Sequence, residues 1–130
     1  SGPIGGPGIP EWGFLPIPKK ILATGVRDML RLSDARMSGT AFGTVVVHIT
    51  PESAGGGPLS AIRDGDMVEI DVPNRKLNLL ISDEELDARL ESDSNDVPEF
   101  KRGYKWLHAQ HILQADKGCD FDFLRSEILQ

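Results

Sequence analysis

The chain has 130 residues, of which 39% are hydrophobic and 26% are charged, a length and composition typical of a single globular domain. Twenty acidic and 14 basic residues give a formal net charge of −6, whereas nucleic-acid surfaces concentrate Lys and Arg. The longest apolar runs, such as TVVVHI, are too short to cross a bilayer. We therefore expect neither nucleic acid nor a membrane as a partner.

The cellular compartment is predicted from cysteine usage and from the start of the chain. Cys119 is the single cysteine, so no internal disulfide can form, and the Cys and His residues do not have the spacing of a zinc site. The first residues lack the basic and apolar stretches of a secretory signal, which favours a cytoplasmic protein. The opening SGPIGGPGIP precedes any periodic segment and indicates the middle of a longer chain.

The first predicted elements are a short helix and two strands. One or two helical turns are expected after Pro18 and should end at Gly25, with residues 29–32 leading into a strand. Residues 44–50 are mostly β-branched and apolar, which is typical of a strand buried on both faces at the centre of a sheet. His48 in that strand is predicted to be a core histidine bonded to the backbone.

A β-hairpin is predicted in the middle of the chain. A glycine-rich loop and a helical turn over residues 59–62 lead to a turn at residues 64–65. Apolar and polar residues then alternate over residues 68–72 and again over residues 77–81, on either side of a Pro-Asn turn. This period of two predicts paired strands.

Two helices are predicted in the last third of the chain. Ser82 and Glu85 match a capping box, so a helix should begin at Asp83. Residues 92–130 are interpreted as a polar linker followed by a helical tail, with an amphipathic helix that ends near Gly118. Its apolar and aromatic face comprises Phe100, Tyr104, Leu107, His108 and His111. Together the elements predict a mixed α/β, strand-dominated domain, a mixed sheet or small barrel with a few peripheral helices.

The Gly/Pro-rich opening does not match a nucleotide-binding loop. A Walker motif needs Gly-Lys and a hydroxyl residue after its spacer, but Gly13 is followed by Phe14, and no strand precedes the glycines as a dinucleotide site requires. The stiff loop presents Glu11, whose carboxylate could ligate a hard cation such as Mg²⁺. The alternative is an ordinary solvated glutamate.

The stretch MSGTAFG, residues 37–43, places Ser38 and Thr40 among small residues. Small neighbours allow a ligand to approach the hydroxyl groups closely, although a tight turn is the simpler interpretation. A Gly-x-Ser-x-Gly elbow is not present, and His48 lies in a predicted buried strand, so a Ser-His-Asp triad is not supported. His108 and His111 are expected on a helix face rather than at a metal.

Four stretches in a fixed order carry a family resemblance: GPIGGPGIPEWGFLPIP, LSDARMSGTAFGTVVVHITPESAGGGPLSAIRDGD, ISDEELDARL and LQADKGCDFDFL. They resemble the C-terminal part of the dihydroxy-acid and phosphogluconate dehydratase family, over essentially the whole chain. SDARMSGTAFG and the tail look most like the sugar-acid branch, whose members dehydrate aldonic acids such as arabinonate or xylonate. The resemblance implies a lyase with a larger N-terminal α/β domain.

The resemblance also implies the fold and the cofactors. Residues 1–130 would form a single C-terminal barrel domain of the swivelling β/β/α type. The iron–sulfur cluster would be held by cysteines of the N-terminal domain, so its ligands would not be on this chain and the isolated domain would be inactive. Mg²⁺ would be a second cofactor, and the full-length protein would be a homodimer or homotetramer.

Site residues follow from the resemblance residue by residue. Ser38 aligns with a serine proposed to take the C2 proton as an alkoxide, Glu11 with a carboxylate proposed to bind Mg²⁺, and Thr40 and Gly39 would contact the sugar acid. The C3 hydroxyl would leave to a Lewis-acidic iron, and the enol would tautomerise to a 2-keto-3-deoxy acid. The alternative is a non-catalytic, stand-alone binding or carrier module with the same barrel.

Overall fold

The computed structural model describes residues 2–6, 15–39, 43–92 and 99–124. Its elements in chain order are α1 (Lys19–Ala23), β1 (Arg31–Leu32), β2 (Val45–Val46), η1 (Ser53–Gly55), η2 (Pro58–Ala61), β3 (Val68–Asp71), β4 (Lys76–Leu79), α2 (Asp83–Ser92), α3 (Gly103–His111), η3 (Ala115–Lys117) and η4 (Asp122–Leu124), where η marks a 3₁₀ helix. Within these ranges no helix is long and apolar enough to span a bilayer.

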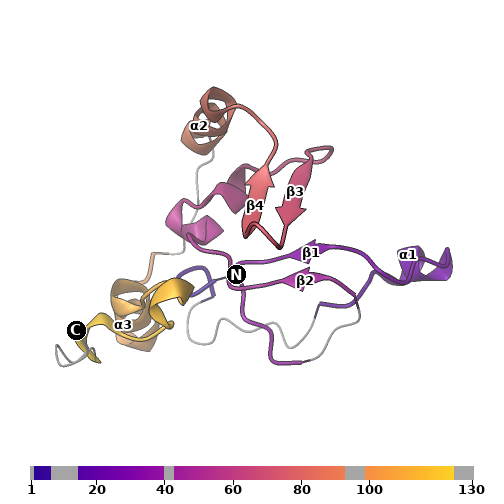
Figure 1. Cartoon of the computed structure of the whole chain (residues 1–130). Coiled ribbons are helices and arrows are strands. Elements are labelled where there is room, and N and C mark those ends of the chain that lie inside the picture. The colour runs from indigo at the N-terminus through magenta and orange to yellow at the C-terminus, as the bar shows by residue number, and fades with distance from the viewer. Residues whose placement is uncertain (1, 7–14, 40–42, 93–98, 125–130) are drawn as a thin grey trace.

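The strands form two separate sheets. β1 and β2 pair in parallel, with Arg31 opposite Val45, and β3 and β4 pair antiparallel, with Val68 opposite Leu79. In Figure 1 the hairpin and α2 lie on one side of the β1–β2 pair. α1 lies beyond one end of this pair, and α3 lies beyond the other end. A mixed α/β architecture is confirmed. The described strands close no barrel, and at two to four residues each they are shorter than α2 and α3, so the described part is not strand-dominated.

The expected strand over residues 44–50 is wrong in its length and burial. Only Val45–Val46 is a strand, and both residues are half-buried because the described sheet has a single partner strand, β1. His48 adopts a positive φ of 59°, which turns the chain out of an extended path. The residue is exposed, so the prediction of a core histidine is also wrong.

The locally encoded elements are confirmed. α1 is followed by Gly25 at a φ of 89°, and the predicted hairpin is present as β3 and β4. α2 begins at Asp83, and the Ser82 hydroxyl accepts a hydrogen bond from the Glu85 amide at 3.2 Å, as an N-cap should.

The second predicted helix is shorter than expected. α3 ends at His111 instead of near Gly118, because Ile112 leaves the helix to form an antiparallel bridge with Phe121. The Leu113 amide continues this pairing with a 2.8 Å hydrogen bond to the Asp120 carbonyl. Long-range pairing of the tail therefore overrides the helical period.

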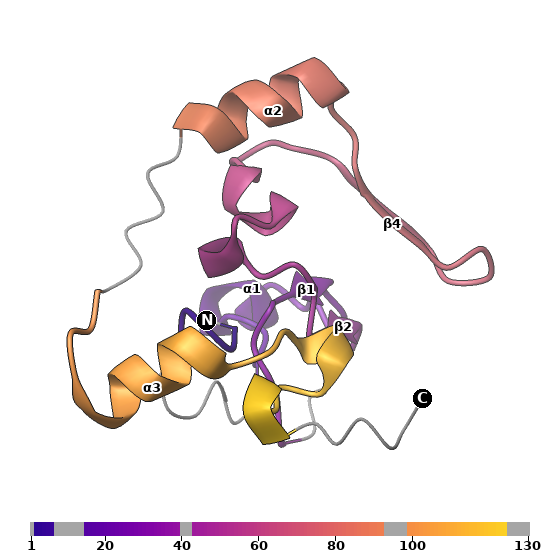
Figure 2. The ribbon, with the colours of Figure 1, turned by 90° about the vertical axis from the view of Figure 1, so that its left-hand side faces the viewer.

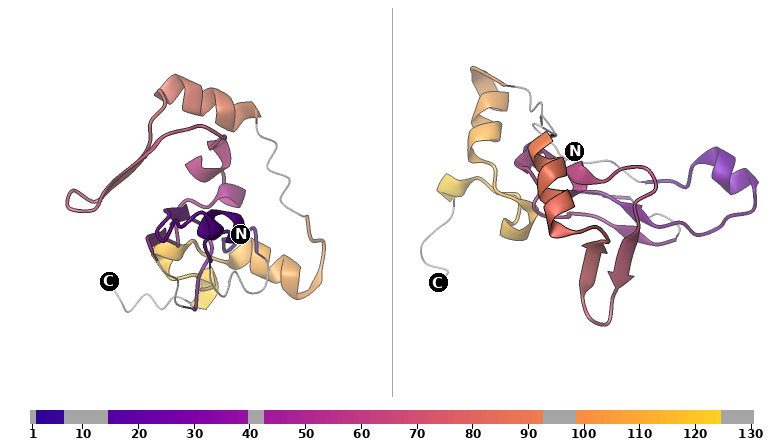
Figure 3. Two further views of the ribbon diagram at one scale, coloured as in Figure 1. Left: turned by 90° about the vertical axis from the view of Figure 1, so that its right-hand side faces the viewer. Right: turned by 90° about the horizontal axis from the view of Figure 1, so that it is seen from above.

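Few side chains of the described residues are buried, and polar ones are among them. The buried hydrophobic residues are Ile17, Ala35 and Ala61, and the buried polar ones are Asp34, Glu52 and His108. The start of the chain lies beside α3 and the C-terminal 3₁₀ turns in two perpendicular views (Figure 2, Figure 3). Glu52 lies where they meet, since it accepts hydrogen bonds from the Ile4 and Gly5 amides and from Gln114 Nε2.

Candidate functional site

The segment 33–39, which carries Ser38, is fixed at its start by backbone hydrogen bonds to β2 and to the residues that follow it. The Ser33 amide donates to the Val46 carbonyl at 3.0 Å, and the Ser33 carbonyl accepts from the Ile49 amide at 3.3 Å. The carbonyl of Ala35, which is only 1% exposed, accepts from the His48 amide at 3.2 Å. The β1–β2 pairing therefore continues irregularly into this segment and holds its first half.

Asp34 adds a side-chain anchor that the sequence pattern does not reveal. It is buried, and its Oδ2 accepts a 2.8 Å hydrogen bond from the Ser53 amide at the start of η1. A buried carboxylate needs such donors because water no longer solvates it. Asp between small residues is an ordinary turn signal, so only the fold shows that Asp34 joins two loops.

Ser38 and Gly39 are the last described residues of this segment, and both are exposed. Ser38 is thus an exposed residue four positions beyond a buried anchor. A serine hydroxyl acts as a base only where a nearby positive charge stabilises its alkoxide form. The predicted substrate residue Thr40 and the predicted Mg²⁺ ligand Glu11 lie outside the described residues, so the structure brings together only Ser38 and Gly39.

The histidines of the described chain do not form a metal site. His108 is buried against the rings of Tyr104 and Phe121, and burial lowers its pKa although the charge of Glu52 opposes the shift. His111 lies 3.0 Å from the Asp122 carboxylate through Nδ1. Over residues 2–6, 15–39, 43–92 and 99–124, no three His, Cys, Asp or Glu side chains could together hold a metal ion.

Cys119 does not have the environment of a cluster ligand. Its side chain is half-buried, and burial, followed by the charge of Glu52, raises the pKa of its thiol, with Arg36 acting in the opposite direction. Metal ligation requires the thiolate, which a raised pKa disfavours. The described residues alone therefore fit neither an iron–sulfur cluster nor Mg²⁺.

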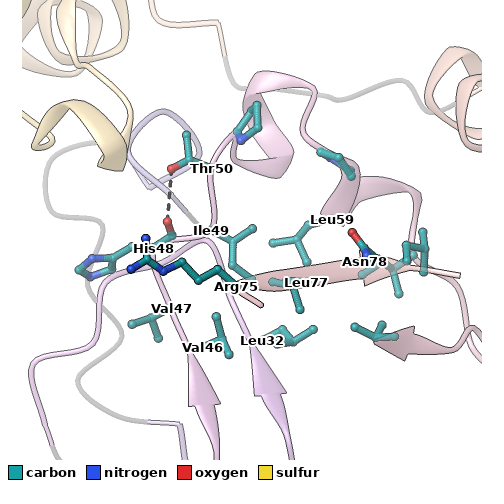
Figure 4. A pocket seen from close by; sticks show the side chains of 15 residues that line it. Leu32, Val46, Val47, His48, Ile49, Thr50, Leu59, Arg75, Leu77 and Asn78 are labelled. Atoms are coloured by element: carbon teal, nitrogen blue, oxygen red, sulfur yellow. Dashed lines mark hydrogen bonds between the residues drawn. The ribbon is translucent and has the colours of Figure 1, made fainter. Parts of the chain in front are cut away.

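A pocket of about 480 Å³ lies between the β1–β2 pair and the β3–β4 hairpin. Val46, Ile49, Leu59 and Leu77 are among its apolar walls, and His48 and Arg75 lie at one end (Figure 4). Both of these polar residues have positive φ, 59° and 55°. Ser38 and Gly39 are not among the lining residues, so this pocket and the predicted base occupy different places.

Comparison with known proteins gives strong matches over nearly the whole chain. The chain is 51% identical to 6-deoxy-6-sulfo-D-gluconate dehydratase of Pseudomonas putida over 97% of its length and 55% identical to L-arabinonate dehydratase of Rhizobium leguminosarum bv. trifolii over 95%. It is 38% identical to dihydroxy-acid dehydratase of Halothermothrix orenii over 92%. It spans 21–22% of the length of these three relatives.

The family pattern described as dihydroxy-acid/6-phosphogluconate dehydratase C-terminal matches residues 1–119. This range contains both anchors of the Ser38 segment, Asp34 and Ser53, together with the predicted residues Ser38 and Glu11. The chain belongs to the dihydroxy-acid/6-phosphogluconate dehydratase family, whose C-terminal domain it represents.

Proposed function

We propose that this chain is the C-terminal part of a sugar-acid dehydratase, a hydro-lyase that converts a 2,3-dihydroxy sugar acid into a 2-keto-3-deoxy acid. One observation carries the proposal: relatives named for sulfogluconate and arabinonate share 51–55% identity with the chain, whereas a relative named dihydroxy-acid dehydratase shares 38%. Because the chain spans about a fifth of these relatives, the catalytic unit would need an N-terminal part of the same protein.

In this proposal Ser38 removes the C2 proton of the sugar acid, and Gly39 and Thr40 contact the substrate. The C2–H electron pair forms the C2=C3 double bond as the C3 hydroxyl leaves, and the proton that Ser38 took departs with that hydroxyl as water, which restores the alkoxide. The resulting enol then tautomerises to the 2-keto acid. The arrangement of the loop supports this role, since a serine that is exposed on an anchored segment is accessible to a substrate, and proton transfer requires an approach to about 3 Å. Buried Asp34 keeps the start of the segment in place.

The remaining components of the proposal rest on the family resemblance. Glu11 would bind Mg²⁺, and an iron–sulfur cluster would be held by an N-terminal α/β domain of the same protein. The complete enzyme would be a cytoplasmic homodimer or homotetramer that takes a sugar acid as its substrate.

The test is the turnover of aldonic acids by the full-length protein and by its Ser38→Ala variant. The wild type should form a 2-keto-3-deoxy acid from arabinonate or a related acid. Removal of a general base typically lowers kcat by about 10²- to 10⁴-fold, whereas a matched Ser92→Ala control at the exposed end of α2 should leave kcat unchanged. If the wild type turned over no aldonic acid, the proposed function would be wrong. If Ser38→Ala kept half of the wild-type rate, Ser38 would not be the base.

A further inference from the structure

Glu52 is a fully buried carboxylate that the proposed chemistry does not use. Its side chain is 0% exposed, and its two oxygens accept three hydrogen bonds. The Ile4 amide and Gln114 Nε2 donate to Oε1 at 2.6 and 2.7 Å, and the Gly5 amide donates to Oε2 at 3.0 Å. Burial of a carboxylate without such donors costs free energy. These three contacts therefore indicate a hydrogen-bonded cluster built around Glu52.

The backbone of Glu52 is held as firmly as its side chain. Its amide donates to Gln114 Oε1 at 2.9 Å, so the two residues exchange hydrogen bonds. Its carbonyl accepts from the amides of Gly55 and Gly57 at 3.0 and 2.8 Å. A Cβ atom at Gly2 would lie 2.4 Å from Glu52 Oε2, so only glycine allows the start of the chain to approach this closely.

The neighbouring residue connects this cluster to the proposed site. The Ser53 amide donates to buried Asp34, which anchors the segment that ends in Ser38. The turn at Glu52 and Ser53 therefore joins the start of the chain, the Ser38 segment and the tail at Gln114. The figures show residues 2–6 beside α3 and the 3₁₀ turns that follow it, as these contacts require (Figure 2, Figure 3).

We infer that Glu52 is a positioning residue for Ser38: its carboxylate packs residues 2–6 and Gln114 around the turn whose next amide holds Asp34. The link to catalysis rests on the proposed function, whereas the contacts do not. Loss of the carboxylate would release the two outer segments and then loosen the turn, so that Ser38 would be presented less accurately to substrate. Small misplacements of a reacting group lower the rate strongly.

The test uses the full-length protein with Glu52→Gln, which keeps the size but puts an NH₂ donor where an oxygen accepts. Amide hydrogen exchange of Ile4, Gly5 and Ser53 should accelerate about tenfold or more, since hydrogen bonds to charged groups are among the stronger ones. Exchange in the β3–β4 hairpin should not change, which separates this effect from general destabilisation. The kcat for the aldonic acid should fall about tenfold or more while its KM stays within about threefold.

Glu69→Gln is the matched control, because Glu69 is an exposed carboxylate whose Oε2 accepts a hydrogen bond from Asn78 on the neighbouring strand. In this variant the amide hydrogen exchange rates of Ile4 and Gly5 should equal those of the wild type. The kcat should also be unchanged. If Glu52→Gln does not fold, Gly2→Ala displaces residues 2–6 from Glu52 while leaving the Glu52–Gln114 pair, and should give the same local exchange and fall in kcat.

Three results would overturn the inference. Unchanged exchange at Ile4 and Gly5 would show that the carboxylate does not hold the start of the chain. Faster exchange with a wild-type kcat would show that the cluster does not position Ser38. A wild-type protein that dehydrates no aldonic acid would overturn the proposed function, and with it the link to catalysis, although the exchange data would still decide whether Glu52 holds residues 2–6.

Discussion

Replacement of Gly55, Gly56 and Gly57 by alanine, one at a time, tests the turn that holds Glu52. Gly57 has an ordinary φ of −73°, but a Cβ atom there would lie 1.8 Å from the Pro51 carbonyl oxygen and 2.8 Å from that of Glu52. Ordinary contact begins at 3.4 Å, so the Pro51 oxygen would have to recede by about 1.6 Å, the difference between 3.4 and 1.8 Å. Both obstacles are backbone atoms and cannot rotate away.

The expected losses in free energy of unfolding differ because the three glycines differ in the space around Cβ and in φ. Gly57→Ala adds overpacking and weakens the 2.8 Å bond from its amide to Glu52, which together cost about 2–4 kcal/mol. Gly56 has open space but a φ of 81°, so alanine costs about 1 kcal/mol of backbone strain. At Gly55 the new methyl group would be 3.6 Å from Glu52 Cγ, an ordinary contact, so the change should stay within about 0.5 kcal/mol.

Urea unfolding of the 130-residue chain, followed by far-UV circular dichroism, measures these losses as shifts of the midpoint at constant m. We expect the largest loss of stability for Gly57→Ala, a smaller loss for Gly56→Ala and the smallest for Gly55→Ala. Equal losses at all three positions, or the largest loss at Gly55, would refute the steric argument and the geometry of the turn.

Three further outcomes follow from single residues. Ser82→Ala should lower the free energy of unfolding by about 1 kcal/mol and Ser82→Gly by only a few tenths, because glycine is a fair N-cap; thermal melts of both variants check this, and equal losses would contradict it. The hydrogen bond from Arg89 lowers the pKa of Asp66, so its stabilising effect is present above the unfolded pKa of about 4 and is lost as the pH falls through the lower folded pKa. The urea midpoint of Asp66→Asn should therefore fall less than that of the wild type between about pH 5 and pH 2. An equal fall of the midpoint in both proteins would contradict a stabilising Asp66–Arg89 ion pair. Because burial raises the pKa of Cys119, a thiol reagent at neutral pH should modify it more slowly than free cysteine, and the rates should become equal in concentrated urea.

Elements encoded by neighbouring residues could be predicted from the sequence. The Ser82 cap gave the start of α2, and the alternation around Val68 and Leu77 gave the hairpin. The run around Val45 shows that each residue suits a strand, but it does not show how many strands lie beside it. The end of α3 at His111 depends on Phe121, which pairs with Ile112 from across a turn.

The site could be predicted only where a motif carries it. Ser38 was identified from its small neighbours and from the resemblance, and its role stays a prediction. Asp34, Glu52 and Gln114 have no local pattern, because they act on residues 19 to 62 positions away. Buried carboxylates that join distant loops are visible only after the chain is folded.

The junction at Glu52 also has a consequence for the order of folding. Its hydrogen bonds to Ile4 and Gln114 close loops of 48 and 62 residues, whereas the hairpin and α2 form from residues close in sequence. Chain entropy must be lost before such distant contacts form, so we expect the junction to assemble after the transition state. Removal of the Gln114 side chain would then accelerate unfolding and leave the folding rate almost unchanged.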